Sequence, residues 1–175
     1  MMDKTLELID ESDRGSVIVA AALLEDDIGE LLQKVIKSHN ISTKHIKDMF
    51  GLSGPLSSFS SKILICFGFG FISKEIFDDL TKIRKLRNKF AHSSEKVDFL
   101  SADIEDHVAT INCCIDASKH FEGSMFKSRK KTLSADQPRL EDWEARSSGY
   151  IKYTKSVFCL GVNILRQKIR SFDLS

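Results

Sequence analysis

One octet of the sequence, KLRNKFAH at residues 85–92, brings together side chains that could do acid–base chemistry. Arg87 and His92 are separated by four residues, and Asn88 directly follows the arginine. Cleavage of a phosphodiester without a metal ion needs a base, an acid and a cation. His92 could serve as base and acid because histidine titrates near neutral pH, and Arg87 could stabilise charge on phosphorus. The octet is therefore either a catalytic pair or the polar end of a structural helix.

Helices are predicted throughout the chain, and the octet lies on the last turns of one of them. Ser73 is a good N-cap for this helix, whose buried stripe recurs at steps of three and four: Ile76, Phe77, Leu80, Ile83, Leu86 and Phe90. The same periodicity predicts helices at about 13–37 and 139–171, and a short helix is expected at 42–50 before Gly51. In the glycine-broken apolar segment, Phe67, Phe69 and Phe71 alternate with glycine as in a strand, but no neighbouring segment offers a strand partner. We therefore expect a helix there too, at about 56–70. One more helix is expected to start at Ser101, with four apolar residues facing the core: Ile104, Val108, Ile111 and Ile115. We therefore expect an all-α fold, a single-domain helical bundle of about six helices over residues 1–175.

The helix geometry separates Arg87 from His92. At 100° per residue the two positions point about 140° apart on an ideal helix. Convergence would require the helix to end or distort near Ala91, or a second subunit to complete the site. On the structural interpretation, His92 binds carbonyl groups of the last turn, and Arg87 pairs with a carboxylate such as Asp13 or Glu11. A binding surface without catalysis is the third interpretation.

The composition is that of an ordinary globular protein. The 26 basic and 25 acidic residues nearly balance, so no global field draws the chain to nucleic acid or to a membrane. The most apolar stretch, residues 63–72, is half of the roughly twenty residues that a membrane helix needs. The four cysteines stand among apolar residues without a CxxC spacing, which favours buried reduced thiols: Cys66, Cys113, Cys114 and Cys159. We expect no cofactor, no metal site and a cytoplasmic setting in a bacterium.

Two charged clusters are candidate partner-binding residues. The acidic cluster could mimic nucleic acid toward a basic nuclease, or it could be a solvated helix face: Glu25, Asp26, Asp27 and Glu30. The basic cluster lies in a predicted loop at about 122–138 and could hold phosphate or serve solubility: Lys127, Arg129, Lys130 and Lys131. Nucleic acid stays open as a partner, but we find neither a helix-turn-helix signature nor aromatic residues interleaved with basic ones.

Two stretches of the chain resemble a known family. ESDRGSVIVAAALLEDDIGELL at 11–32 and GPLSSFSSKILICFGFGFISKEIFDDLTKIRKLRNKFAH at 54–92 are similar to the MltR family, the mannitol operon repressor and its relatives. The turn of Gly54, Pro55 and Leu56 and the glycine-broken apolar segment before Ser73 are the most specific parts. The resemblance covers most of the chain and implies an all-helical bacterial protein with a regulatory or binding role and no known catalytic residue.

A second resemblance belongs to the octet alone. Arg87, Asn88 and His92 resemble the R-x4-6-H motif of HEPN-domain proteins, helical modules that include metal-independent RNases of toxin and antiphage systems. In those enzymes the arginine and histidine of two protomers meet across a dimer. This resemblance implies these three residues as catalytic residues and a homodimer as the active form.

The preferred function is that of a non-enzymatic protein that binds and occupies a partner protein. The partner would be a regulatory protein, for an MltR-like regulator, or a toxin, for an antitoxin or immunity protein. One alternative is a HEPN-type RNase that uses Arg87 and His92. The other is an accessory DNA-binding transcriptional regulator that uses the basic loop.

Overall fold

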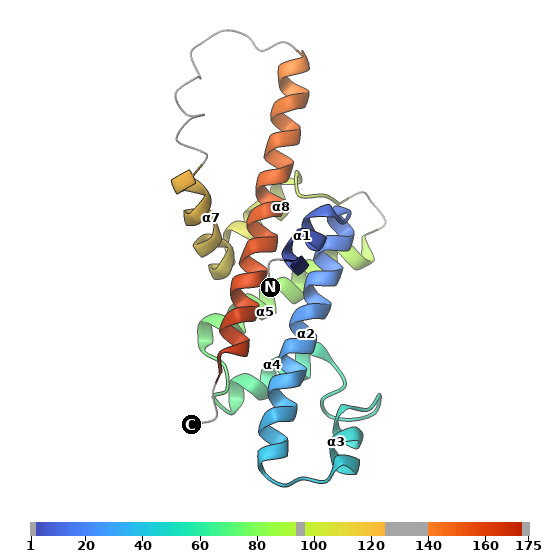
Figure 1. Cartoon of the computed structure of the whole chain (residues 1–175). Helices are drawn as coiled ribbons and strands as arrows, with labels where there is room; N and C mark the ends of the chain where they lie inside the picture. The colour runs from blue at the N-terminus through green and yellow to red at the C-terminus, as the bar shows by residue number, and fades with distance from the viewer. Residues whose placement is uncertain (1–2, 94–96, 125–139, 173–175) are drawn as a thin grey trace.

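Helices make up all the regular secondary structure in the part of the chain that the computed structural model describes (Figure 1). That part comprises residues 3–93, 97–124 and 140–172, with side chains described for 7–93, 97–119 and 153–172. Its eight helices are α1 (Asp3–Asp10), α2 (Asp13–Ser38), α3 (Thr43–Phe50), α4 (Phe59–Gly68), α5 (Lys74–His92), α6 (Ala102–Ala109), α7 (Asn112–Ser124) and α8 (Leu140–Arg170). The predicted all-α fold is confirmed, and the helices in these ranges are eight where about six were expected.

Serine side chains determine where four of the helices begin. Each hydroxyl accepts a hydrogen bond from the backbone N–H three residues further on, at the starts of α2, α3, α4 and α5: Ser12, Ser42, Ser58 and Ser73. A cap of this kind is worth about 0.5–2 kcal/mol. The sequence did not indicate α1, which is tied to α2 because Ser16 Oγ donates to Leu8 O at 2.6 Å.

The helix expected after Ser101 is two helices, α6 and α7, because the chain turns at Thr110 and Ile111. There the backbone N–H groups of both residues bond three residues back, to His107 O at 3.1 Å and Val108 O at 3.1 Å. The turn reorients the residues that follow it. Ile115, expected to face inward, is 40% exposed.

The segment for which a strand was the alternative is helical. α4 ends at Gly68, and Gly70 then adopts a φ of +74°, which L residues other than glycine rarely adopt. Phe67 packs on Phe77 of α5 with ring centroids 4.3 Å apart, so the two helices stack closely here. No strand is present in the described residues, in agreement with the helical prediction.

The core lies where α2, α5, α7 and α8 meet. Figure 1 shows α8 running between α2 and α7, and α2 also packs along α5. Three fully buried phenylalanines connect α5, the segment before α6, and α8. Phe99 stands between Phe90 and Phe158, with ring centroids 5.7 and 5.5 Å away. Burial of apolar area at this junction holds the end of α5 near the middle of α8.

The turn at Gly54 allows us to predict the effect of a substitution. Gly54 N donates to Gly51 O at 2.8 Å, and a Cβ added at Gly54 would lie 2.2 Å from Asp48 O. Gly54→Ala is therefore expected to force the backbone apart and to lower the free energy of unfolding by about 2 kcal/mol, measured by urea denaturation. Gly29→Ala is the control, because a Cβ there meets nothing within 4 Å and should stabilise α2 by about 1 kcal/mol. Equal effects of the two substitutions would contradict this account.

Candidate functional site

The octet 85–92 ends α5, and none of its predicted internal contacts forms. α5 continues without distortion through His92, and Ser93 N closes the helix by donating to Lys89 O at 3.1 Å. Arg87 Nη1 donates to Asn88 Oδ1 at 3.0 Å. His92 is exposed and makes no hydrogen bond or ion pair with any residue that the structure describes. Arg87 and His92 therefore do not converge within one copy of the chain.

The carboxylate partner predicted for Arg87 is also wrong. Asp13 accepts a hydrogen bond from Phe99 N at 3.1 Å and pairs with Lys155 Nζ at 3.5 Å. Lys155 reaches the backbone oxygen of Glu11 as well, so a lysine of α8 occupies the place that we had expected Arg87 to take. Both Arg87 and His92 are left at the protein surface. Of the three interpretations of the octet, a binding surface fits this geometry best.

The lysines and arginines between Lys82 and Lys89 on α5 divide into two groups. Lys82 Nζ contacts Thr110 O, and Lys89 forms an ion pair with Asp103 of α6. Arg84, Lys85 and Arg87 form no ion pair with any carboxylate in the described ranges. The first group holds α6 against α5, whereas the second group presents charge to the outside.

Arg14 belongs to the same end of the molecule, although the sequence gave no reason to group it with α5. Its Nη2 donates to Ser93 O at 3.0 Å, which places the start of α2 beside the end of α5. Like the second group on α5, Arg14 has no ion-pair partner among the described carboxylates. Only the packing of α2 on α5 reveals this neighbour, because 79 residues separate Arg14 from Ser93 in the chain.

The acidic cluster is divided between the interior and the surface. Asp27 is 2% exposed, and it pairs with Arg166 Nε at 2.6 Å and Arg170 Nη2 at 2.6 Å. Glu25 pairs with Lys62 Nζ of α4 at 2.7 Å. The expectation of one solvated acidic face is therefore wrong for Asp27, whose carboxylate joins α2 to α8. The other two members of the cluster are exposed: Asp26 and Glu30.

The basic cluster of the predicted loop lies outside the described residues: Lys127, Arg129, Lys130 and Lys131. Its role as a partner-binding site stays a prediction.

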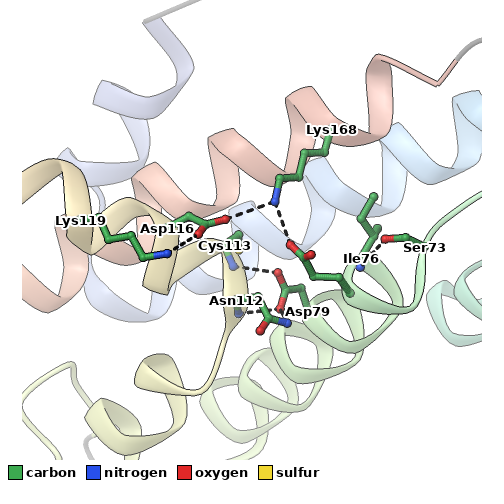
Figure 2. A network of polar contacts seen from close by, with 9 residues as sticks. Ser73, Ile76, Asp79, Asn112, Cys113, Asp116, Lys119 and Lys168 are labelled. Carbon is green, nitrogen blue, oxygen red and sulfur yellow. Dashed lines mark hydrogen bonds and ion pairs between the residues drawn. The ribbon is translucent and has the colours of Figure 1, made fainter.

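A polar network joins α5, α7 and α8 (Figure 2). Asp79 of α5 accepts hydrogen bonds from Asn112 N at 2.8 Å and from Cys113 N at 2.9 Å, so it caps the start of α7. Lys168 of α8 bridges Glu75 at 2.9 Å and Asp116 at 3.3 Å. Hydrogen bonds from Lys119 and Lys168 lower the pKa of Asp116, and the bond to Glu75 raises the pKa of Lys168. These residues tie the three helices together.

A cavity of about 220 Å³ lies between α6, α7 and α8. Its lining is mainly apolar: Glu105, Val108, Ala109, Cys114, Ile115, Ser118, Tyr153, Thr154 and Val157. Neither Arg87 nor His92 contributes to it. The cavity therefore offers no setting for the chemistry that the octet suggested.

The four cysteines are buried and free, as predicted. Burial raises the pKa of Cys66 to about 12 and that of Cys159 to about 12. Their thiols are therefore protonated and unreactive at neutral pH. In the described ranges, no three histidine, cysteine or acidic residues are grouped so that they could hold a metal ion. None of the helices in those ranges is long and apolar enough to cross a membrane.

The model of one protein family, described as MtlR, mannitol repressor, matches residues 1–170; it is the family written MltR above. A chain in the X-ray structure of the MtlR–HPr complex from Escherichia coli has a similar fold, with a TM-score of 0.71 and 18% identity over 96% of this chain and 97% of that one. A possible transcriptional regulator, YggD from Shigella flexneri 2a, has a TM-score of 0.71 and 15% identity over 97% of this chain and 98% of its own. No curated protein sequence matches the chain.

Proposed function

The chain belongs to the mannitol repressor family, and on this premise we propose that it acts as a regulator by binding a protein partner. The match of the family model over residues 1–170 carries the proposal. Protein binding is supported by the similar fold of a chain that was solved in complex with HPr. The geometry of the octet supports a binding role over cleavage, because Arg87 and His92 lie apart on the surface of α5 and do not form a catalytic pair within one chain. HPr of the same host is the first partner that we propose, in the cytoplasm of a bacterium.

Isothermal titration of the purified full chain with HPr from its own host tests the proposal. We expect saturable one-to-one binding with a Kd on the order of micromolar, as is usual for transient regulatory complexes of modest interface area. An unrelated small protein of the same size and net charge is the control. Heat signals that do not differ between HPr and this control would contradict HPr as the partner.

Nothing in the fold or in the relatives favours an antitoxin or immunity role, or cleavage of RNA by Arg87 and His92. Direct contact of DNA by the basic loop stays a prediction, because that loop lies outside the described residues.

A further inference from the structure

Basic side chains that form no ion pair with a described carboxylate lie on the end of α5 and on the start of α2, which Arg14 joins through Ser93 O; all of them are exposed except Arg84, which is half-buried. We call this surface the α2/α5 face and define it by six residues: Arg14, Ile18, Arg84, Lys85, Arg87 and His92. Most ion pairs of the described residues lie elsewhere, as between Lys62 and Glu25 or between Lys168 and Glu75. The cations of the α2/α5 face have no such carboxylate in the described ranges, so their charge is available to a partner.

The four members on α5 share one side of the helix. At 100° per residue, Arg87, Arg84, His92 and Lys85 follow one another over an arc of about 160°. The remaining two basic residues of the run, Lys82 and Lys89, lie beyond the edge of this arc and are held by Thr110 and Asp103. The structure thus divides the cations of α5 into two that contact α6 and the turn after it, Lys89 and Lys82, and others that lie along the arc.

The packing of α2 adds an apolar side chain to the same face. Arg14 is anchored to the end of α5 through Ser93 O, and Ile18 stands one turn later on the same side of α2. Ile18 is 37% exposed, although isoleucine is among the residues that are most often buried. An apolar side chain with charged residues around it is the usual anatomy of a protein–protein interface.

We infer that the α2/α5 face is the docking surface for a protein partner that presents carboxylates around an apolar side chain. The inference rests on the proposed function and names the surface and the charge of the partner. The cations would attract such a partner over several ångströms and fix its orientation, while Ile18 would be buried at the centre of contact. The apolar Ile18 and the absence of phenylalanine, tyrosine and tryptophan among the six favour a protein over a nucleic acid, whose bases stack chiefly on such side chains.

Photo-crosslinking from Ile18 in the full chain tests the inference. Ile18→p-benzoylphenylalanine is produced in the native host, and the captured peptide is identified by mass spectrometry. The control carries the same group at Ile41, which is 38% exposed and lies outside the α2/α5 face. We expect the probe at position 18 to capture one protein through a peptide rich in aspartate and glutamate, and the probe at 41 to capture at least tenfold less of it.

Charge reversal then tests the cations. Arg84→Glu with Arg87→Glu should reduce the yield from position 18 at least tenfold, whereas reversal of two exposed lysines of α3, Lys44→Glu with Lys47→Glu, should leave it unchanged. Capture of nucleic acid, of a second copy of this chain, or of a peptide without acidic residues would overturn the inference.

The same variants distinguish a wrong surface from a wrong function. If the Arg84→Glu, Arg87→Glu chain binds HPr in calorimetry as tightly as the unchanged protein does, the surface is wrong and the proposed function stands. If the unchanged protein binds no HPr and position 18 captures no protein, both are overturned.

Discussion

Replacing Asp27 with alanine is expected to lower the free energy of unfolding by about 3–5 kcal/mol. Asp27 stands in the middle of α2 and is 2% exposed, and Arg166 of α8 is 6% exposed. Two guanidinium nitrogens of Arg166 donate to the carboxylate of Asp27, Nε at 2.6 Å and Nη2 at 3.3 Å. Without the carboxylate the guanidinium would stay buried with its charge uncompensated, and this desolvation is the source of the large effect.

Urea denaturation followed by circular dichroism measures the effect, and neighbouring substitutions control it. Asp26→Ala changes the next residue of α2, which is exposed, and should alter the free energy of unfolding by no more than about 0.5 kcal/mol. Arg170→Ala should cost less than Asp27→Ala, because the Arg170 side chain is 41% exposed and can be hydrated. An Asp27→Ala chain as stable as the Asp26→Ala chain would show that the buried pair does not hold α2 to α8.

Replacing the whole pair distinguishes a buried charge from a lost contact. Asp27→Leu with Arg166→Met removes both charges and retains apolar volume, so it should recover most of the stability that Asp27→Ala loses. A double variant that is no more stable than Asp27→Ala would assign the effect to packing.

Local signals in the sequence were sufficient for most helices. Ser12, Ser42, Ser58 and Ser73 mark helix starts because capping depends on residues only three positions apart. The buried stripes follow from the helical period in the same way. The resemblance to the mannitol repressor family, read from residues 11–32 and 54–92, agrees with the family model over residues 1–170.

The predictions that failed depend on residues far apart in the chain. Asp27 is flanked by acidic residues and looks solvated, and its partner Arg166 is 139 positions away. The partner predicted for Arg87 was wrong for the same reason, since Lys155 of α8, far along the chain, pairs with Asp13. Periodicity identifies which side of a helix is buried, but it does not identify which charges meet across an interface.

The turn between α6 and α7 was missed because the buried stripe passes through it. Ile104, Val108 and Ile111 are all buried, so the pattern looks continuous although the helix is not. The side chain that stabilises the new start is Asp79, which lies on another helix and 33 residues before Asn112. A cap supplied by a different helix leaves no mark in the sequence around the break.

That distant cap leads to the second large effect: Asp79→Ala is expected to lower the free energy of unfolding by about 3 kcal/mol. Asp79 is 1% exposed, and its two oxygens accept from Asn112 N, Asn112 Nδ2 and Cys113 N. The substitution leaves these donors without an acceptor, at about 1–3 kcal/mol for each buried group; Cys113 N is buried and the two Asn112 donors are part-buried. Asp78→Ala is the matched control, because among the described residues Asp78 pairs only with the exposed Lys74.

The position of the cap predicts that the damage from Asp79→Ala will be local to α7, and the cysteines report this. Cys113 and Cys114 follow the capped residue directly, whereas Cys66 lies on α4. The hydrogen bond with Cys114, together with burial, raises the pKa of Cys113, so this thiol reacts only after α7 opens. We therefore expect Asp79→Ala to speed alkylation of Cys113 and Cys114 at least tenfold over Cys66, as measured by mass spectrometry of iodoacetamide-labelled peptides. Equal acceleration at all three cysteines would mean that the whole bundle unfolds together, and unchanged rates would mean that Asp79 does not hold the start of α7.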